Sequence, residues 1–349
     1  MQISRVSLGT MLFGTTLNKS DSFSILDEFY DLGGRVIDTA QMYPVPCSKK
    51  KIGLTEKIIG EWLISNNLRS EFFISSKIAG KSDKLKFLNQ NYSNIFSKKH
   101  LMGEIYKNLS RLKVDYLDIL YLHWPVRKTH NFGLGVSANP KILYENNIKA
   151  SDYGFYIENI FELYKKGLIR NIGISNETPY GLIKFIQEIK RLNYNGKLYL
   201  QNPINLLSPS YVITMQEICF REKISVQAHS PLAFGLLTQS KIDSLIDKKI
   251  DKSSRFFQYP NYFNRYAKNR SDEFILELYK LAKRKNINIY DLAYGFLLND
   301  STISHVVIGP RTKKQLRISV KSIIDFEQNY KLYSEELYQI IKKYSIVSF

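Results

Sequence analysis

Short runs rich in β-branched residues alternate with amphipathic helical stretches along almost the whole chain. Most of these runs are followed by a polar loop and then by a segment whose apolar residues recur every three or four positions. Such alternation predicts right-handed βαβ units and therefore a parallel sheet. Eight runs are predicted to be strands: Val6–Thr10, Arg35–Thr39, Glu71–Lys77, Tyr116–His123, Ile169–Ser175, Leu198–Gln201, Ser225–His229 and Val306–Gly309.

Helical periodicity is evident between these strands and again near the C-terminus. The predicted helices include Ser22–Leu32, Glu56–Asn66, His100–Leu112, Tyr156–Lys166, Tyr180–Arg191, Leu206–Arg221, Ser271–Lys285 and a terminal helix over Glu335–Val347.

Eight β units in 349 residues favour a closed barrel, although a doubly wound sheet has the same alternation. Polar residues decide between the two, because they stand at or near the C-terminal ends of successive strands, where a barrel builds its site. These residues are Asp38, Lys77, His123, Asn176, Gln201 and His229. On an open sheet they would lie in a row and could not converge. We therefore predict a single-domain (β/α)₈ TIM barrel over residues 1–349.

Three connections exceed the usual length, and long loops over a barrel mouth commonly shape the binding site. They are Ala79–Lys99, Arg127–Tyr156 and Leu236–Arg270. The first predicted strand begins so early that we expect a reduced N-terminal hairpin, or none, beneath the barrel.

The chain is basic: 50 Lys and Arg against 32 Asp and Glu give a net charge of +18. Such an excess is typical of nucleic-acid binders, which neutralise phosphates, and that class stays open as an alternative. The lysines are nevertheless spread along the chain rather than clustered, so we predict solvated faces and no nucleic-acid partner.

The two cysteines, Cys47 and Cys219, cannot form a disulfide framework and match no zinc-ligand spacing. A reducing, cytoplasmic location is the prediction that fits best. No uninterrupted run of about 18 apolar residues is present, so no membrane span is expected. The segment after Arg5 faintly resembles a signal sequence but has no evident small-residue cleavage site.

Four residues on or just after consecutive predicted strands form a plausible proton-delivery group: Asp38, Tyr43, Lys77 and His123. A free phenol has a pKa near 10, so a tyrosine needs a nearby ammonium to act as an acid at neutral pH. Lys77 would supply that ammonium, Asp38 would hold it charged, and His123 would bind the substrate oxygen. Each residue alone has a purely structural alternative, but the four together favour catalysis.

Several long strings resemble the aldo-keto reductases, and within them the Tas-type NADP(H)-dependent group. They are IDTAQMYPVP, SSKIAG, VDYLDILYLHWP, IRNIGISNET, QNPINLL, SPLAFGLLT and IGPRTKKQL. The resemblance implies a barrel that binds NADP(H) without a Rossmann domain, a small-molecule carbonyl substrate and no metal. It also implies that Asp38, Tyr43, Lys77 and His123 are the catalytic tetrad.

The resemblance implies a cofactor-binding residue set as well. Ser175, Asn176 and Gln201 would hold the nicotinamide carboxamide, since an amide needs partners that donate and accept. The loop with Ser230, Leu232 and Gly235 would wrap the pyrophosphate, and Arg255 would lie near the phosphates. Gly309, Arg311 and Gln315 would bind the adenosine end, where a guanidinium suits a 2′-phosphate.

The chain departs from the family pattern at three places. His229 stands where the family usually has an aromatic residue stacked on the nicotinamide. Lys241 is displaced by one position from a phosphate-contacting lysine, and Ile318 and Ser319 replace the usual acid or amide pair near adenine.

Position alone suggests Met42, Trp124 and Tyr153 as substrate-lining residues. The predicted function is reduction of an aldehyde or ketone with NADPH, with Tyr43 as proton donor. The alternatives are the same chemistry in the alcohol direction, and a cofactor-sensing regulatory protein without substantial activity.

Overall fold

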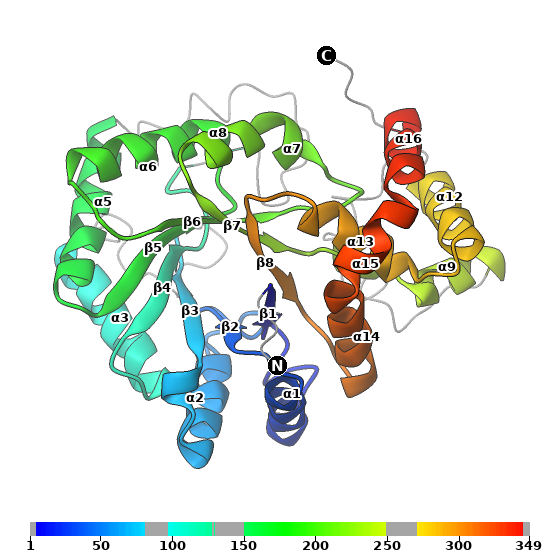
Figure 1. Cartoon of the computed structure of the whole chain (residues 1–349). Coiled ribbons are helices and arrows are strands. Elements are labelled where there is room, and N and C mark those ends of the chain that lie inside the picture. Colours follow the sequence, from blue (N-terminus) through cyan, green and yellow to red (C-terminus); the bar gives the residue numbers. More distant parts are fainter. Residues whose placement is uncertain (1–4, 81–96, 128, 130–149, 249–270, 345–349) are drawn as a thin grey trace.

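The computed structural model describes residues 5–80, 97–127, 129, 150–248 and 271–344. Eight parallel strands close into a barrel in which neighbours along the chain are neighbours in the sheet, and β8 pairs with β1 (Figure 1). This confirms the predicted (β/α)₈ barrel. The strands are β1 (Val6–Gly9), β2 (Val36–Asp38), β3 (Phe73–Ile78), β4 (Leu117–Leu122), β5 (Ile169–Ser175), β6 (Leu198–Pro203), β7 (Ser225–His229) and β8 (Ile303–Ile308).

Helices cover the outside of the barrel, and α9, α12 and α16 gather beside one another at one edge (Figure 1). The helices are α1 (Lys19–Asp31), α2 (Leu54–Asn66), α3 (Lys98–Leu112), α5 (Ala150–Lys165), α6 (Pro179–Arg191), α7 (Ser210–Thr214), α8 (Gln216–Arg221), α9 (Gln239–Ile246), α12 (Ser271–Arg284), α13 (Ile289–Leu298), α14 (Lys313–Ile324), α15 (Phe326–Asn329) and α16 (Ser334–Tyr344).

Several predicted boundaries differ from the structure, and two of these differences have a clear physical reason. The expected helix Leu206–Arg221 begins only at Ser210, after Pro209, and it is interrupted at Met215 (φ −135°). A proline disfavours the helical conformation of the residue before it, so a helix starting at Leu206 could not continue through this point. The last strand starts at Ile303, three residues earlier than predicted, because Ile303 pairs with Val226 of β7.

The barrel interior is packed with side chains rather than open. Tyr121 of β4 is fully buried, and its ring lies against Gly173 of β5. A Cβ at Gly173 would lie 2.3 Å from that ring, so only glycine leaves room for the tyrosine. A second apolar cluster lies under α9, α12, α13 and α16.

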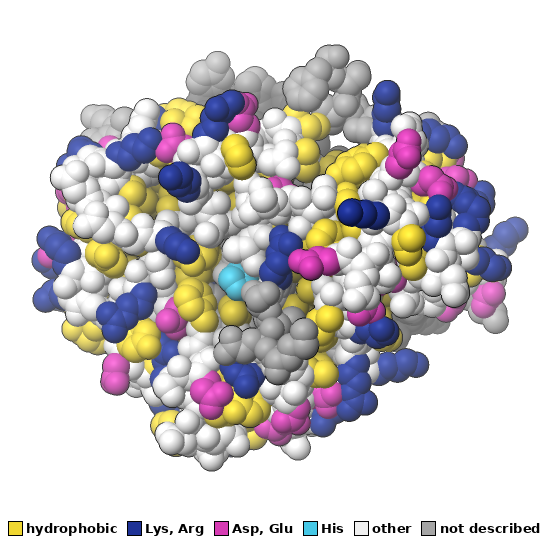
Figure 2. All heavy atoms as spheres, viewed as in Figure 1, with side chains coloured by type: hydrophobic (Ala, Val, Ile, Leu, Met, Phe, Trp, Pro, Cys, Tyr) yellow, Lys and Arg dark blue, Asp and Glu magenta, His cyan; other side chains and the backbone are white. Residues whose placement is uncertain are grey.

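The three long connections lie largely outside the described residues, as do residues 1–4, on which the hairpin expectation depends. Within the described parts of the chain, no helix combines the length and apolar character that a membrane crossing requires. On the face shown in Figure 2, Lys and Arg side chains are dispersed among acidic and uncharged ones. On this face the basic side chains do not gather into one patch.

The burial of His305 in β8 predicts acid sensitivity. Burial, with a smaller effect from the nearby Arg5 charge, lowers the pKa of His305 to about 4. Below the unfolded pKa of about 6.5 the unfolded chain therefore binds more protons than the folded one, and stability falls as pH falls. His305 alone should cost about 2 kcal/mol of unfolding free energy at pH 5 relative to pH 7.

Urea unfolding at the two pH values, for the wild type and for His305→Gln, measures this effect. The variant should lose less stability than the wild type between pH 7 and pH 5. Equal losses would show that His305 does not remain neutral in the folded protein.

Candidate active site

A cavity of about 770 Å³ opens at the C-terminal ends of the strands. Most of the predicted site residues line it: Asp38, Met42, Tyr43, His123, Ser175, Asn176, Gln201, His229, Ser230, Leu232, Gly235, Gly309, Arg311 and Gln315. Lys77 does not line the cavity, but its ammonium forms an ion pair with Asp38, which does line it. Arg255 lies outside the described residues.

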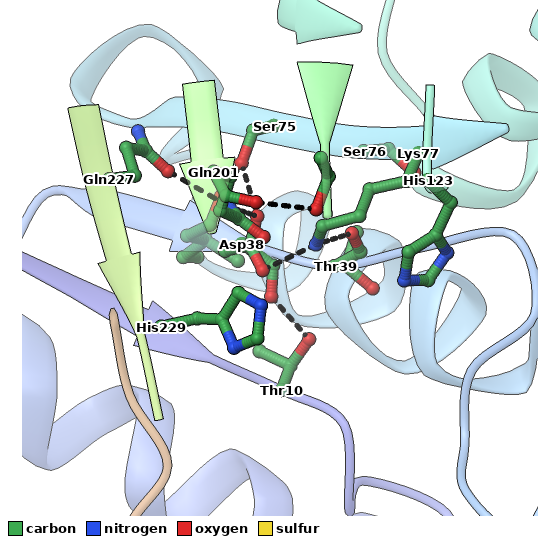
Figure 3. Close-up of polar contacts among 12 residues, drawn as sticks. Thr10, Asp38, Thr39, Ser75, Ser76, Lys77, His123, Gln201, Gln227 and His229 are labelled. Atoms are coloured by element: carbon green, nitrogen blue, oxygen red, sulfur yellow. Dashed lines mark hydrogen bonds and ion pairs between the residues drawn. The ribbon is translucent and has the colours of Figure 1, made fainter. Parts of the chain in front are cut away.

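The centre of the site is the ion pair between Lys77 and Asp38, from adjacent strands β3 and β2 (Figure 3). Lys77 Nζ lies 2.5 Å from Asp38 Oδ2 and donates to the Thr39 carbonyl at 2.8 Å. Asp38 Oδ1 accepts from Ser75 Oγ and from Gln201 Nε2, both at 2.8 Å. Every carboxylate oxygen thus has a donor, which is what a buried charge requires.

Burial and pairing act on Lys77 in opposite directions. The side chain is 1% exposed, and desolvation lowers the pKa of Lys77 below its ordinary value. The Asp38 carboxylate opposes that decrease by attraction and by hydrogen bonding. Asp38, with a smaller contribution from the Glu56 charge, therefore favours an ammonium at a position where burial alone would favour the neutral amine.

Tyr43 and His123 lie at the cavity side of this pair. Lys77 Nζ is 5.3 Å from the centre of the Tyr43 ring, and the Tyr43 and His123 rings meet edge to face with centroids 5.7 Å apart. Burial is the main cause that lowers the pKa of His123 well below its usual range, and the Lys77 and His229 charges add to it. His123 is therefore a neutral imidazole near pH 7, able to hydrogen-bond but unsuited to supply a proton.

Asn176 joins three strand ends through its side chain. Its amide nitrogen donates to the His123 carbonyl at 2.9 Å and to Ser175 Oγ at 3.0 Å. Its oxygen lies 3.1 Å from His229 Nε2, which must therefore carry the hydrogen. In the neutral imidazole, Nδ1 then accepts from Ser230 Oγ at 3.0 Å. His229 thus contacts the amide that the resemblance assigns to the carboxamide.

The loop after β7 has an unusual backbone. Ser230, Ala233 and Phe234 have positive φ values of 57°, 46° and 59°, and Gly235 follows at 103°. Non-glycine residues seldom adopt this region, and such strain is concentrated at ligand-binding sites. The N–H groups of Ala233 and Gly235 donate within the loop, to Ser230 O and Leu232 O. The resemblance implies that backbone N–H groups of this loop bind the pyrophosphate, whereas these two N–H groups already have acceptors within the loop.

Three basic side chains line the cavity. They are Lys241 of α9, Lys248 just after it, and Arg311, which directly precedes the N-cap of α14. Gln315 accepts from the Arg311 backbone N–H at 2.8 Å, so its side chain orders the helix start. Lys241 lies 3.2 Å from Asp272, whereas no acidic residue among the described ones pairs with Arg311. A helix N-terminus beside a cation such as Arg311, which has no acidic partner among the described residues, suits a phosphate.

The three positions suggested for substrate differ in placement. Met42 lines the cavity. Trp124 lies behind the cavity wall in an apolar cluster with Ala40 and Ala79. The centroids of the Trp124 and His123 rings are 5.1 Å apart. Tyr153 is not brought to the cavity: it lies on α5 in the main core, against Phe185. The predicted loop to Tyr156 is helical from Ala150, so Tyr153 joins the apolar face of that helix.

Sequence reasoning missed several polar residues that hold the tetrad. Ser75 precedes Lys77 by two positions, so both point to the barrel interior, and the strand period of two could have identified it. Thr10 donates its hydroxyl to the Asp38 carbonyl at 2.8 Å. Gln227 accepts from Gln201 at 3.1 Å, and it too precedes the predicted site residue His229 by two positions.

Comparison with known proteins identifies the family. The model of the aldo/keto reductase family matches residues 5–339. The chain is 28% identical to Protein tas of Escherichia coli (strain K12) over 93% of this chain and 90% of that protein. It is 28% identical to an aldo-keto reductase of Babesia bovis over 72% of this chain and 89% of that protein. It is 24% identical to aryl-alcohol dehydrogenase GME11368 of Pestalotiopsis microspora over 99% and 79%, respectively. The strand ends of this barrel bring together an Asp, a Lys, a Tyr and a His, and the family model matches nearly the full length of the chain. The chain therefore belongs to the aldo-keto reductase family.

Proposed function

We propose that this protein is an NADPH-dependent carbonyl reductase, in which a carbonyl carbon accepts a hydride and the carbonyl oxygen accepts a proton from Tyr43. The observation that carries the proposal is the convergence of Tyr43, His123 and the Lys77–Asp38 pair at the wall of one cavity. Family membership supports the reaction class, oxidoreduction.

The chain's own groups divide the proton chemistry. His123 donates a hydrogen bond to the substrate oxygen and thereby orients the carbonyl. Tyr43 delivers the proton, and the Lys77 ammonium stabilises the phenolate that this leaves. Asp38 keeps Lys77 charged, while Ser75 and Gln201 hold Asp38 in place.

The residues along the cavity fit a dinucleotide phosphate. A reduced nicotinamide supplies the hydride when it is bound. Asn176 bonds the His123 carbonyl and Gln201 bonds Asp38, and Arg311, Lys241 and Lys248 line the same cavity with the chemistry of phosphate ligands. A Cβ built on Gly309 would meet no atom closer than 3.9 Å, so this glycine leaves space beside the same cavity.

The wall beside Tyr43 favours an apolar or aryl carbonyl. Met42 and Val45, which belong to the apolar cluster against which Tyr43 packs, line the cavity, and Ala40, Ala79 and Trp124 support them from behind. Aromatic and apolar substrates gain from such surfaces. The similarity to an aryl-alcohol dehydrogenase agrees with this substrate class.

Consumption of NADPH with a panel of aldehydes and ketones, headed by 4-nitrobenzaldehyde, tests the proposal. We expect turnover with at least one aromatic aldehyde, and slower reverse reaction with the matching alcohol and NADP⁺. Tight NADPH binding with no turnover in either direction would favour a cofactor-sensing protein instead.

Arg311 should give the site its preference for NADPH over NADH. A charge-assisted contact with the 2′-phosphate contributes roughly 1.5 to 3 kcal/mol, so Arg311→Ala should weaken NADPH binding by about 10- to 150-fold. NADH lacks this phosphate, and its affinity should change little. Lys313→Ala is the matched control, because Lys313 lies near Glu28 on the outer side and does not line the cavity. Equal losses for both cofactors, or none for either, would remove Arg311 from the phosphate site.

A further inference from the structure

A buried polar cluster behind the tetrad is not used by the proposed chemistry. It lies between α2, α3 and the loop from Asp38 to Gly53, and it contains the buried carboxylates Glu56 and Glu104. Two buried acids away from the reacting atoms need a reason, because burying a charge is unfavourable without specific partners. Those partners connect the two helices to the elements that carry Lys77 and Tyr43.

Gln41 is the residue through which the Tyr43 loop is attached. It is 2% exposed, and all four of its hydrogen-bonding groups are used. Its backbone N–H donates to the Lys77 carbonyl at 3.0 Å, and its carbonyl accepts from Gly53 at 2.9 Å. Its side-chain Oε1 accepts from the Ala79 N–H at 3.0 Å, and its Nε2 donates to Glu104 Oε2.

These contacts require an amide. The Ala79 N–H can only donate, so the side chain at position 41 must accept there. Glu104 Oε2 can only accept when ionised, so the same side chain must also donate. Lys107 holds the other oxygen of Glu104 at 2.7 Å. A glutamine meets both demands without taking up or losing a proton.

The other acid anchors the strand of Lys77. Ser76 Oγ donates to Glu56 Oε1 at 2.5 Å, and Arg111 Nε donates to Glu56 Oε2 at 2.6 Å. Arg111 in turn packs against Gly53, where a Cβ would lie 2.3 Å from its Cδ. Helix α2 is thus bonded to β3 through Ser76, and helix α3 is bonded to the loop that carries Tyr43 through Gln41.

We propose that Gln41 is a positioning residue, which sets the placement of Tyr43 relative to Lys77 by joining the loop to the end of β3 and to Glu104 of α3. The inference rests on the proposed function for its kinetic consequence. Tyr43 follows Gln41 by two residues, and its own carbonyl shares the Gly53 N–H at 3.1 Å. A displaced loop would move the phenol away from Lys77 and from the substrate oxygen.

An exchange of the acid and the amide tests the pair. Gln41→Glu places two carboxylates within hydrogen-bonding distance, so kcat with NADPH and 4-nitrobenzaldehyde should fall by about 10- to 100-fold, as for a small misplacement of a catalytic group. Glu104→Gln should be mild, because the new amide oxygen can still accept from Gln41. Combining the two restores a carboxylate at one position and an amide at the other, and should recover most of kcat.

Two further readouts separate positioning from loss of stability. The affinity for NADPH, measured by fluorescence, should stay unchanged in all three variants. The loss of kcat in Gln41→Glu, relative to the wild type, should become smaller as pH falls. One proton shared by the carboxylates at positions 41 and 104 then provides the hydrogen-bond donor that the glutamine amide provided. Among the described residues, the titratable or charged groups near Glu104 are Lys107 and His100 on α3 and Glu56 on α2, and all are shared by the variants compared.

Tyr211→Phe is the matched control. It removes another buried side-chain hydrogen bond, to Thr302 at 2.7 Å, away from the cavity. It should lower the unfolding free energy but not kcat. Hydrogen exchange of residues 38–47 provides a measurement without turnover: exchange should rise in Gln41→Glu and return to the wild-type level in the double variant.

Failure to restore kcat and exchange in the double variant, or an equal loss of kcat in Tyr211→Phe, would overturn the inference. A wild type that does not oxidise NADPH with any carbonyl would instead contradict the proposed function, while the exchange measurement would still decide whether Gln41 and Glu104 hold the loop.

Discussion

Replacing Tyr43 by Phe should lower kcat for carbonyl reduction by about 10²- to 10⁴-fold, the usual contribution of a positioned acid. The substitution removes only the hydroxyl, so the ring keeps its edge-to-face contact with His123. His123 cannot take over, because burial holds its pKa well below neutrality. NADPH binding should therefore persist while turnover is lost.

Tyr199→Phe is the control for this experiment. Tyr199 is a largely buried tyrosine near the start of β6, and it does not line the cavity. Its variant should keep the wild-type kcat. A Tyr43→Phe protein that keeps most of the wild-type kcat would exclude Tyr43 as the proton donor.

Replacing Lys77 by Met should affect both catalysis and stability. The phenolate of Tyr43 loses the ammonium that stabilises it, so the loss of kcat should be comparable to that of Tyr43→Phe. The change also leaves Asp38 buried without its cation, and breaking a buried ion pair from one side costs about 3 to 5 kcal/mol. Urea unfolding and steady-state kinetics measure the two effects separately.

The double variant Asp38→Asn/Lys77→Met separates the two effects of the Lys77 substitution. It removes the buried carboxylate together with the cation, so it should regain part of the lost unfolding free energy. Activity should stay low, because no ammonium is present. Recovery of activity in the double variant would contradict the role given to Lys77.

The architecture could be predicted from sequence because its signal is local and repeated. Most strands are short runs that contain β-branched residues and most of the helices show a regular apolar period, so their alternation indicates the barrel. Helix α13 was missed because eight of its ten residues are buried, which leaves no polar face to reveal its period. The helix expected from Leu206 begins only at Ser210, after Pro209. The apolar residues on both sides of this proline follow a helical period, so the pattern alone did not indicate the later start.

The site was predictable only where residues stand at strand ends. Asp38, Lys77, His123, Asn176, Gln201 and His229 follow that rule, Tyr43 comes in the loop just after such an end, and the resemblance supplied the other cofactor residues. Which polar groups meet across strands depends on register and side-chain direction, and the sequence pattern does not encode the pairing of Gln201 with Asp38, 163 residues apart. The link from Gln41 to Glu104 spans 63 residues and was missed for the same reason.

Transfer of deuterium tests the central claim most directly. The protein is mixed with a carbonyl panel and NADPH that carries deuterium at both C4 positions of the nicotinamide, and the products are examined by mass spectrometry. The account predicts an alcohol with one deuterium on the former carbonyl carbon from the wild type, and far less from Tyr43→Phe. Saturating NADPH binding without deuterated alcohol from any aldehyde or ketone would contradict it.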